Sequence, residues 1–420
     1  MEALRLINWI IGIVFFVCYT YQFVYIPVVW FIKDRRHKET KPHRYAILVC
    51  ARNEKNVLGD LLDSIKAQTY DASLLHTFVL ADNCTDNTAD IARSHGATVY
   101  ERFNNKEIGK GYALDALIGH IREDYPEGFD AYMVFDADNI LSPDYVEKMN
   151  VTFSDGHDII TSFRNSKNYG DNWVSAGYAL WYIRESRYLN HARYKLRSSC
   201  AVSGTGFLFS RKIVDELGGW PFHMLVEDIE FSIHQIVNRR KIAMAPDAVL
   251  YDEQPTSFRQ SWRQRERWCK GGLQVFGRYM PQLAKGIFRG SWSCFDVTMN
   301  LMPAFILSVI GLISNTVLAV YGAIVGENLW IAVQSFTEML FDVYLTMFAV
   351  GAITVITEWK IIRTTTWKKI FYVFTFPLFM FTYMPIALTV LFKKVEWKPI
   401  EHTVSAEKLK KRSDEEALPF

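Results

Sequence analysis

Two kinds of hydrophobic pattern divide this chain into a mixed middle region and two strongly apolar ends. Between residues 45 and 255, apolar runs of strand length alternate with segments in which apolar residues recur at helical spacing. Residues 6–32 are almost uncharged, and further apolar stretches begin after residue 300. Such stretches are long enough to cross a bilayer, which takes about 20 residues in a helix. The pattern therefore predicts an α/β domain flanked by membrane-spanning helices.

The middle region begins with strand and helix patterns in alternation. Apolar runs that end in polar loop residues predict four strands, at residues 45–51, 76–81, 97–101 and 131–135. Helical patterns lie between them, including residues 110–122. This order is typical of a mostly parallel sheet with helices on both faces. A dinucleotide-binding Rossmann domain is an alternative, but no G-x-G-x-x-G motif follows the first strand.

Two carboxylates, Asp136 and Asp138, follow the fourth predicted strand in the order Phe-Asp-Ala-Asp-Asn. They would project from the carboxyl end of that strand, where open α/β sheets bind ligands. Carboxylate oxygens suit Mg²⁺ or Mn²⁺, and Mg²⁺ commonly lies between carboxylates and substrate phosphates. The pair by itself also fits a solvated loop. After it, Ser142 and Pro143 predict a helix start, as the capping residue and the first helical residue.

Similar polar clusters follow the first two predicted strands. Asn53 and Glu54 come after the first strand, and Asp82 and Asp86 come at the end of the second. One cluster of this kind is ordinary loop chemistry. Because the carboxyl ends of parallel strands meet at one edge of a sheet, three such clusters indicate a binding site there.

The later part of the middle region carries three further features. Residues 171–193 form a long aromatic helical pattern, whose default interpretation is core packing. Residues 202–207 are glycine-rich, which fits either a turn or a close approach of the backbone to a ligand. Glu227 and Asp228 open a helix that reaches about residue 237, a position where acidic residues also occur for dipole reasons alone.

A basic stretch with two tryptophans, residues 257–269, is predicted to be helical. Its spacing puts Gln264, Arg267 and Trp268 on neighbouring faces. The planar guanidinium of Arg267 can bind phosphate, and a tryptophan ring can cover a sugar. The alternative is a basic amphipathic helix on an anionic membrane surface, and both interpretations can hold on opposite faces of one helix.

Charge and cysteine content narrow the class of protein. The 420 residues carry a formal charge of +2, which lacks the strongly basic balance of a nucleic-acid-binding protein. The six cysteines have no paired spacing, which predicts reduced thiols and no zinc site. Only Arg5 is basic before the first apolar segment, whereas basic residues follow it at once, namely Lys33, Arg35, Arg36, Lys38 and Lys41. The positive-inside rule then places the amino terminus outside and the middle region in the cytoplasm.

The carboxyl-terminal part is predicted to contain two spans and one broken apolar segment. The spans cover residues 301–325 and about 339–356, with Glu338 and Asp342 one turn apart on a buried or water-lined face. The broken segment, residues 371–392, contains two prolines. If it crossed the bilayer, the basic tail after it would lie outside, against the positive-inside rule. We therefore expect a re-entrant or interfacial element that keeps the tail in the cytoplasm.

Taken in order, four motifs resemble those of one enzyme family. They are FDADN at Asp136, SGTGF at Gly204, VED at Glu227 and QRERW at Gln264, with ARNE, the Asp82 cluster and GKG upstream. From about residue 45 to residue 290, the chain is similar to the membrane-integrated, inverting family 2 glycosyltransferases. That group includes cellulose, chitin, hyaluronan and poly-N-acetylglucosamine synthases. The resemblance implies a GT-A fold, an α/β domain with a Rossmann-like, mostly parallel sheet, and a nucleotide-sugar donor that is most often UDP-linked.

The resemblance also implies roles for individual residues. The residues matched to donor binding are Ala51, Asn53, Glu54, Asp82, Lys110, Asp136, Gln264 and Arg267. Asp136 and Asp138 match the metal-binding pair, with Asp138 as the direct ligand of Mg²⁺ or Mn²⁺. Asp228, with Glu227 beside it, matches the general base. The residues matched to acceptor binding are Gly204, Thr205 and Trp268. Residues 397–402 match a tryptophan-containing segment near the active site of related chains.

These expectations define a multi-pass protein of the cell membrane. It would have a transmembrane helix with a basic flank at 1–40, a cytosolic GT-A domain at 41–255 and amphipathic interfacial helices at 256–295. Transmembrane helices at 296–395 and a cytosolic tail at 396–420 would complete it.

The expected activity is transfer of a sugar from a nucleotide donor, UDP-linked, to a growing polysaccharide or other glycan by metal-assisted single displacement. The alternative is a transferase that adds one sugar to a lipid acceptor. The expected partners are the donor, the acceptor, the lipid bilayer and an export partner for the product, and not nucleic acid. A catalytically silent scaffold is disfavoured, because every expected acidic residue is present.

Overall fold

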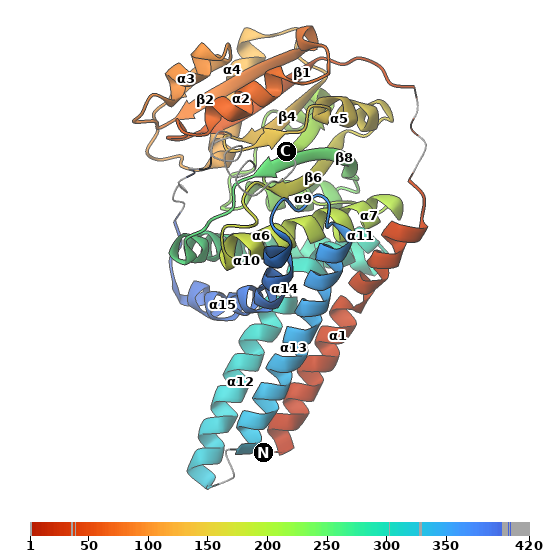
Figure 1. The fold of residues 1–420 in the computed structure, drawn as a ribbon, viewed down its shortest axis with the longest axis vertical. Coiled ribbons are helices and arrows are strands. Elements are labelled where there is room, and N and C mark those ends of the chain that lie inside the picture. Colours follow the sequence, from red (N-terminus) through yellow and green to blue (C-terminus); the bar gives the residue numbers. More distant parts are fainter. Residues whose placement is uncertain are drawn as a thin grey trace.

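A computed structural model describes residues 2–34, 37, 39–301, 303–326, 330–396, 402 and 404 of the chain. An α/β domain lies at one end of the molecule (Figure 1). Three steep helices form a stalk at the other end, namely α1 (Glu2–Phe31), α12 (Pro303–Val325) and α13 (Trp330–Thr357). The predicted basic residues Arg35, Arg36 and Lys38, and the tail from residue 397 onward apart from His402 and Val404, lie outside the described residues.

The first half of the α/β domain is a parallel sheet, as the alternation of patterns predicted. Its strands lie in the order β3-β2-β1-β4 and have the bounds β1 (Tyr45–Ala51), β2 (Leu75–Asp82), β3 (Thr98–Arg102) and β4 (Ala131–Asp136). Because β1 and β4 are covered on both faces, they consist of nearly continuous apolar residues. The helices between the strands are α2 (Leu58–Lys66), α3 (Thr88–Ser94) and α4 (Lys110–Asp124), with the short η1 (Ala72–Leu74) before β2.

The second half of the sheet is mixed, which the expectation of a mostly parallel sheet did not include. It continues in the order β7-β6-β8-β5, with β5 (Ile140–Leu141), β6 (Ile159–Ser166), β7 (Phe207–Ser210) and β8 (Ala243–Asp252). Strand β7 runs antiparallel to both β4 and β6. The amino end of β7 therefore lies beside the carboxyl end of β4. This reversal brings the glycine-rich loop that precedes β7 to the end of the strand that carries Asp136.

The predicted helix start at Ser142 and Pro143 is wrong. Helix α5 runs from Tyr145 to Ser154, and Asp144 is the residue that precedes it. Strand β5 pairs with β8 just before the helix, and the Ser142 amide donates a hydrogen bond to the carbonyl of Val249. Because the chain at Ser142 is still held to the sheet, it cannot yet adopt helical geometry. The sequence showed the capping residue types but not this long-range pairing.

The predicted aromatic helix over 171–193 is present but contains an irregular segment. Helix α6 (Trp173–Arg184) begins with Asn172, which forms a capping box with Ser175. It continues into the π-helical segment η2 (Glu185–Asn190) and then α7 (His191–Lys195). Helices α8 (Arg211–Leu217) and α9 (Glu227–Val237) follow β7, and α9 begins where the sequence predicted.

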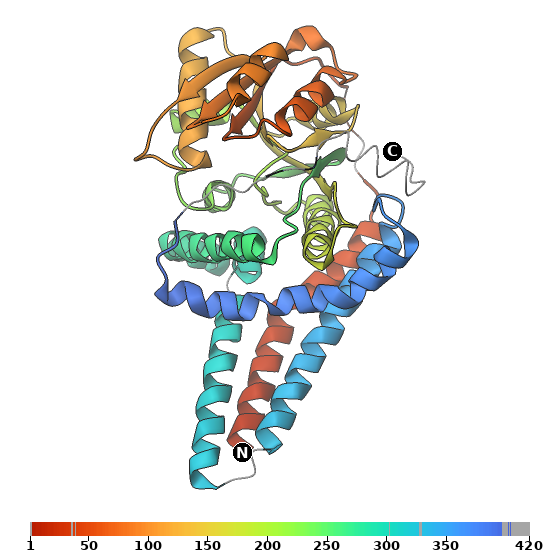
Figure 2. The same cartoon turned by 60° about the vertical axis from the view of Figure 1, so that its left-hand side comes forward.

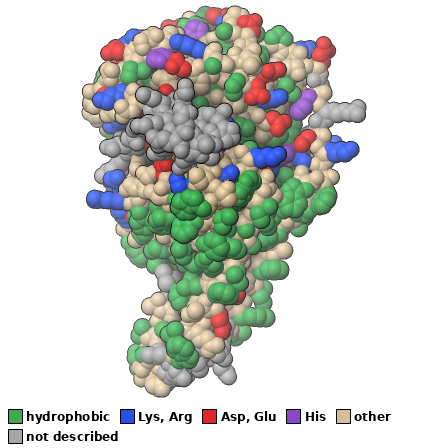
Figure 3. Space-filling model, viewed as in Figure 1, with side chains coloured by type: hydrophobic (Ala, Val, Ile, Leu, Met, Phe, Trp, Pro, Cys, Tyr) green, Lys and Arg blue, Asp and Glu red, His purple; other side chains and the backbone are tan. Residues whose placement is uncertain are grey.

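A long helix separates the α/β domain from the stalk. Helix α10 (Phe258–Phe288) joins the two basic and amphipathic segments into one element, and α11 (Trp292–Leu301) follows it. Helices α6 and α10 lie between the sheet and the steep helices (Figure 1). Hydrophobic side chains gather on the surface below this level, whereas Lys, Arg, Asp and Glu are more frequent above it (Figure 3). The change in surface type fits a boundary between water and membrane at the level of α10.

Among the described residues, three stretches are long and apolar enough to cross a membrane, namely Leu6–Phe31, Phe336–Thr357 and Thr366–Phe392. The predicted span at 301–325 corresponds to a shorter apolar stretch, Val309–Val325. The third stretch is divided into α14 (Thr366–Phe381) and α15 (Tyr383–Phe392). These two helices lie across the upper ends of α1, α12 and α13 rather than beside them (Figure 2).

The break between α14 and α15 has a local cause. Pro385 lies in the first turn of α15, where a missing backbone donor costs little, and it cannot continue the turn of α14. Thr382 occupies the break, and its hydroxyl accepts a hydrogen bond from the Arg265 guanidinium of α10. The predicted proline-broken element is therefore present. Its course across the stalk fits the expected interfacial position better than it fits a further span.

Candidate active site

An elongated cavity of about 1540 Å³ begins at the carboxyl edge of strands β1, β2 and β4 and extends toward the stalk. It gathers residues from the strand ends, from the loop before β7 and from helices α4, α9 and α10. The predicted site residues that line it are Ala51, Glu54, Asp82, Lys110, Asp136, Asp138, Gly204, Glu227, Asp228, Gln264, Arg267 and Trp268. Asn53 and Thr205 are the predicted residues that lie beside the cavity and not on its wall.

At the end of β4, Asp136 and Asp138 have different surroundings. The Asp136 carboxylate forms an ion pair with the Lys110 ammonium, which also donates a hydrogen bond of 2.8 Å to the carbonyl of Gly204. Asp138 is 4% exposed, and its Oδ2 accepts a hydrogen bond of 2.7 Å from the Glu253 amide. Burial opposes the charge on Asp138, but nearby basic groups, His402 first, hold its pKa below the usual range. Asp138 is therefore held ionised at the cavity wall.

The Asp136–Asp138 pair fits a divalent ion that takes part of its coordination from a ligand. Within the described residues, no group of three or more His, Cys, Asp or Glu side chains could hold a metal ion by itself. Two carboxylates facing one cavity are the usual protein contribution where Mg²⁺ or Mn²⁺ also binds substrate phosphates. The oxygen donors present therefore suit a metal that arrives with a phosphorylated ligand.

The loops after β1 and β2 form the far end of the cavity. Asp82 pairs with Arg102 at 2.8 Å, and Glu54 lies 3.1 Å from Nδ1 of His402. Although burial opposes its charge, Asp138 and Glu54 raise the pKa of His402 to about 10. His402 comes from the predicted segment 397–402, the rest of which lies outside the described residues. Asn53 joins the two loops, because its Oδ1 accepts a hydrogen bond of 2.8 Å from the Thr85 amide.

The glycine-rich loop packs closely against the sheet and also faces the cavity, so the predicted turn is confirmed and the predicted approach of the backbone to a ligand stays a prediction. Gly206 has a φ of +65°, and a Cβ there would lie 1.9 Å from a Leu250 methyl group. Gly204 lines the cavity, and a Cβ there would lie 3.6 Å from Oδ2 of Asp228. Thr205 turns away from the cavity, and its hydroxyl accepts a hydrogen bond of 2.9 Å from the Asp136 amide. The loop thus positions the end of β4 and leaves room beside Asp228.

Helix α9 brings two adjacent carboxylates to the cavity in its first turn. Glu227 and Asp228 both line the cavity wall. Burial, with the charge of Asp228 next in importance, raises the pKa of Glu227 to about 7. Burial also raises the pKa of Asp228 above its usual range. Desolvated carboxylates of this kind can exchange a proton near neutral pH, which a general base requires.

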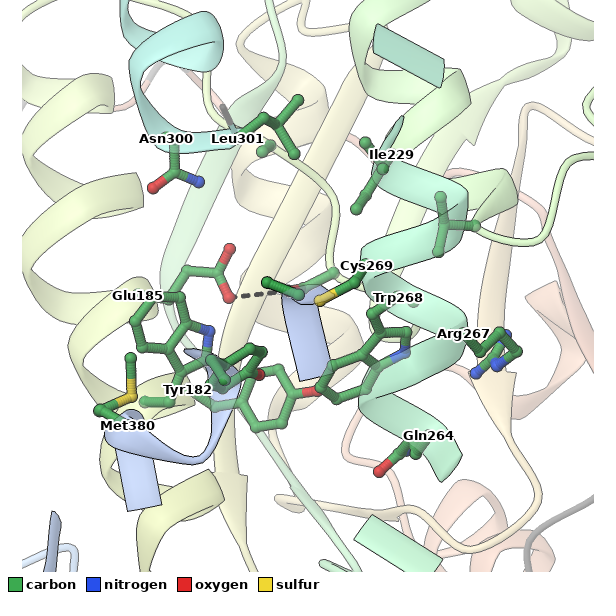
Figure 4. A pocket seen from close by; sticks show the side chains of 18 of the residues that line it. Tyr182, Glu185, Ile229, Gln264, Arg267, Trp268, Cys269, Asn300, Leu301 and Met380 are labelled. Atoms are coloured by element: carbon green, nitrogen blue, oxygen red, sulfur yellow. Dashed lines mark hydrogen bonds between the residues drawn. The ribbon is translucent and has the colours of Figure 1, made fainter. Parts of the chain in front are cut away.

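Helix α10 supplies the wall opposite α6. Figure 4 shows Gln264, Arg267 and Trp268 on α10 across the cavity from Tyr182 and Glu185. The Arg267 guanidinium donates to the carbonyl of Leu225 at 3.0 Å, which fixes its position near the start of α9. Oε1 of Gln264 is buried and has no hydrogen-bond partner within the described part of the chain. Leaving such an atom unpaired is costly, and Gln264 is also one of the residues that line the cavity.

Sequence reasoning missed a second group of polar residues in the cavity. Arg164 pairs with Asp252, its guanidinium lies 3.6 Å from the centre of the Tyr182 ring, and it donates to the carbonyl of Ser203. Glu185 lies in the π-helical segment and accepts a hydrogen bond of 2.8 Å from the Ser203 hydroxyl. The signal available in the sequence was a charged residue, Glu185, within the aromatic helical pattern of residues 171–193. The π-helical turn, a feature often found at functional sites, had no signal in the sequence.

The cavity continues beyond α10 into the stalk. There it is lined by residues of α1 and α13, together with Met380 of α14 and Tyr383 of α15. Glu338 and Asp342 of α13 both line this part and are exposed, so the predicted buried face is wrong for them, whereas the water-lined alternative stays a prediction. One cavity therefore connects the sheet edge with the apolar helices.

Comparison with known sequences connects this site to one enzyme family. Residues 42–271 match the family described as "Glycosyltransferase like family 2". A "Probable glycosyltransferase YdaM" of Bacillus subtilis (strain 168) is 25% identical over 269 residues, which cover 58% of this chain and 58% of that protein. A beta-monoglucosyldiacylglycerol synthase of Synechocystis sp. is 23% identical over 239 residues, which cover 56% of this chain and 48% of the relative.

A poly-beta-1,6-N-acetyl-D-glucosamine synthase of Staphylococcus epidermidis is 23% identical over 287 residues, or 65% of this chain and 64% of the relative. The match to these curated relatives therefore spans between 48% and 64% of their length. Among solved structures, a mannosyltransferase (PcManGT) from Pyrobaculum calidifontis, in complex with GDP-Man and Mn²⁺, aligns with a TM-score of 0.60 at 15% identity. The alignment covers 93% of this chain and 99% of that one, and it shows the expected GT-A-like α/β fold.

Proposed function

Because this chain belongs to the family 2 glycosyltransferases, we propose that it moves a sugar from a UDP-linked donor to an acceptor hydroxyl by metal-assisted single displacement with inversion. The observation that carries the proposal is the position of Gly204 between the two charged ends of the site. Its carbonyl accepts from Lys110, the partner of Asp136, and a Cβ built on it would lie 3.6 Å from Oδ2 of Asp228. A reacting sugar beside this glycine would have phosphate-binding groups on one side and a base on the other.

The donor would bind with its diphosphate near Asp136, Asp138, Lys110 and Arg267. Asp138 and Asp136 are the residues that would hold Mg²⁺ or Mn²⁺, which when bound would neutralise charge on the departing diphosphate. Lys110 and Arg267 add positive charge from α4 and α10. Such preorganised charges stabilise the developing negative charge of a leaving group. Asp82 and Glu54 line the end of the cavity where the nucleoside would lie.

Asp228 would act as the general base. In the reaction, the acceptor oxygen forms a bond to the anomeric carbon while the bond from that carbon to the diphosphate oxygen breaks. The acceptor proton passes to the Asp228 carboxylate, whose raised pKa makes it a better proton acceptor than an ordinary aspartate. Attack from the side opposite the leaving group inverts the anomeric centre.

The acceptor would be a glycan or a lipid, the two classes named among the relatives. The Synechocystis relative is named as a synthase of a glucosyldiacylglycerol, and the Staphylococcus relative as a synthase of a polysaccharide. Trp268 and Gly204 line the side of the cavity where either acceptor would enter. The basic residues after α1 support a cytoplasmic catalytic domain in a multi-pass protein of the cell membrane.

The test is a donor panel on the purified full chain in lipid nanodiscs. UDP-linked and GDP-linked sugars are supplied with Mg²⁺, Mn²⁺ or a chelator, and released nucleoside diphosphate is measured with and without membrane extract as the acceptor source. We expect one or a few UDP-sugars to be turned over, with a requirement for the divalent ion and stimulation by the extract. Release from no donor, or equal release with the chelator, would overturn the proposal.

A further inference from the structure

The part of the cavity inside the stalk, here called the membrane wing, has an apolar wall. From α1 it is lined by Trp9, Ile13 and Phe16, and from α13 by Met339 and Val343. All of these residues lie in stretches that are long and apolar enough to span a membrane. Glu338 and Asp342 are polar exceptions on α13, and Gln334 donates a hydrogen bond of 3.0 Å to Glu338.

The membrane wing is open at its side. Trp9 and Phe16 line the cavity, yet they are 66% and 67% exposed. Part of this exposed area faces the cavity itself, but Val17 beside them on α1 is also 67% exposed and lies outside the lining, so the cavity lies next to the outer surface of the span. Around a membrane span that surface faces lipid, and large exposed apolar grooves of this kind bind apolar partners. The membrane wing therefore opens laterally toward the bilayer.

A passage connects the membrane wing to Asp228. It runs between α10, with Trp268 and Gly272, and the crossing helices α14 and α15, with Met380 and Tyr383. Gly272 is buried, but a Cβ built there would meet nothing within 4 Å. Its side-chain direction therefore points into open space. Methionine and aromatic side chains suit such a passage, because they adapt their shape to an amphipathic ligand.

From these features we propose that the acceptor is a membrane lipid with a neutral hydroxyl headgroup, which enters sideways from the bilayer. Its apolar chains would occupy the membrane wing, and its hydroxyl would pass Trp268 and reach Asp228, with Glu185 beside the headgroup. This inference rests on the proposed glycosyl transfer and names its substrate class. The cavity joins a charged end at Asp228, an aromatic part at Trp268 and Tyr383, and a largely apolar membrane wing in which Glu338 and Asp342 are charged exceptions.

The charges at the top of the passage favour a hydroxyl over a lipid phosphate. A hydroxyl needs a base to remove its proton during attack, whereas a phosphate oxygen is already anionic. Glu185, Glu227 and Asp228 line this end of the cavity together with Arg164 and Arg267. Because Arg164 pairs with Asp252 and Arg267 donates to the carbonyl of Leu225, the three carboxylates, which have no ion-pair partner among the described residues, disfavour a phosphate headgroup there.

The apolar wall also disfavours a growing glycan in the membrane wing. A sugar hydroxyl that leaves water without gaining a hydrogen bond costs about 1–3 kcal/mol. A glycan passing Trp9, Ile13 and Phe16 would incur this cost at many hydroxyl groups. An acyl or isoprenoid chain has no such groups and would gain from the same contacts.

Two glycines allow the membrane wing and the passage to be filled without disturbing their neighbours. Gly12 of α1 lines the membrane wing, Gly272 lines the passage, and a Cβ at either would meet nothing within 4 Å. Gly12→Phe and Gly272→Phe would therefore place a ring in the cavity. Val17→Phe is the control on α1, since Val17 is 67% exposed and lies outside the lining. Gly277→Phe is the control on α10, where a Cβ also has free space and Gly277 is outside the lining.

The experiment uses the full chain in phosphatidylcholine nanodiscs with the radiolabelled donor from the panel. Diacylglycerol is the hydroxyl lipid, a polyprenyl phosphate is the anionic lipid, and a soluble oligosaccharide is the glycan acceptor. Label is measured in the organic phase, in the aqueous polymer fraction and as free sugar from donor hydrolysis. In the unmodified chain we expect label on diacylglycerol. In both cavity-filling variants this labelling should fall at least about tenfold, which corresponds to about 1.4 kcal/mol of lost acceptor binding. Donor hydrolysis by these variants should stay within about twofold of the unmodified chain.

Each other result contradicts either the acceptor class, the lipid site or the proposed function. Label mainly in the aqueous polymer or on polyprenyl phosphate would overturn the hydroxyl-lipid acceptor while glycosyl transfer stands. Cavity-filling variants that match Val17→Phe and Gly277→Phe would overturn the membrane wing as the lipid site. If no condition releases nucleoside diphosphate, the proposed function itself fails. Retained donor hydrolysis distinguishes a blocked acceptor path from a misfolded chain.

Discussion

The carboxylates at the two ends of the cavity differ in whether they have ion-pair partners. At the donor end, three acidic groups have a basic partner, since Asp136 pairs with Lys110, Asp82 with Arg102 and Glu54 with His402. The fourth, Asp138, accepts a hydrogen bond from the Glu253 amide and has basic groups nearby that hold its pKa low. At the acceptor end, Glu185, Glu227 and Asp228 have no ion-pair partner within 4 Å among the described residues. Burial raises the pKa of each of these three groups.

This difference fits the chemistry of the two proposed substrates. A diphosphate and a metal ion carry full charges, so the donor end holds charged groups in place with partners that the ligand can exchange. An acceptor hydroxyl is neutral and must lose a proton, so the acceptor end holds carboxylates whose protonation is easily changed. Gly204 lies at the boundary, where its carbonyl meets Lys110 and a Cβ built on it would lie 3.6 Å from Oδ2 of Asp228.

The largest effect is expected at the acceptor end, from Asp228→Asn. The amide keeps the size of the side chain but cannot take a proton, so transfer should fall by about 10³-fold, within the range for a general base. Donor affinity should stay within about twofold, because the diphosphate groups lie at the other end. Initial rates and donor titration monitored by tryptophan fluorescence measure the two quantities. Near-normal turnover in this variant would show that Asp228 is not the general base.

Asp138→Asn should affect the donor end with a smaller loss, about 10²-fold in transfer at fixed Mn²⁺. The asparagine carbonyl can still accept from the Glu253 amide, so the local fold is retained while a metal-binding charge is lost. The Mn²⁺ concentration for half-maximal donor binding should rise. Asp144→Asn, which changes a surface carboxylate with 45% side-chain exposure, is the matched control. An unchanged Mn²⁺ dependence in Asp138→Asn would contradict the metal assignment.

Glu185→Gln should weaken acceptor binding without weakening donor binding, and its effect should be smaller than that of either aspartate variant. Glutamine can still accept a hydrogen bond from the Ser203 hydroxyl, so the π-helical segment should keep its position. We expect the KM for the acceptor to rise about tenfold, equivalent to ~1.4 kcal/mol of lost binding. The KM for the donor and kcat should change little. A change in the donor KM instead would mean that Glu185 acts at the donor end of the cavity.

The smallest effect concerns pH. Burial raises the pKa of both carboxylates, that of Glu227 to about 7, so transfer by the unmodified chain should rise with pH as the pair loses its protons and Asp228 becomes able to act as a base. Glu227→Gln removes the group that titrates at about pH 7, so the rise should move to lower pH.

The gain at pH 6 should stay below about tenfold, the factor that one pKa unit carries. A pH–rate profile of kcat/KM for the two proteins measures it. Loss of transfer at every pH in Glu227→Gln would mean that Glu227 is the group that must be ionised.

Much of the site could be predicted from local sequence, because its motifs stand at the ends of regular elements. The runs before Ala51, Asp82 and Asp136 form the expected strands, and Glu227 begins the expected helix. Short apolar runs and helical spacing are local properties, so they can be recognised without knowledge of the fold. The position of Thr205 could not be predicted in this way, since its hydroxyl meets the amide of Asp136, far away in sequence.

The sequence by itself determined the class of fold, the family and the residue types at each strand end, because these follow from hydrophobic periodicity and short motifs. Tertiary structure alone decided the reversal of β7 beside β4, the π-helical turn that presents Glu185, the contact of His402 with Glu54, and the course of α14 and α15 across the stalk. Each of these depends on a contact between distant segments or on a turn that packing imposes. They are also the features that join the donor end, the acceptor end and the membrane wing into one cavity.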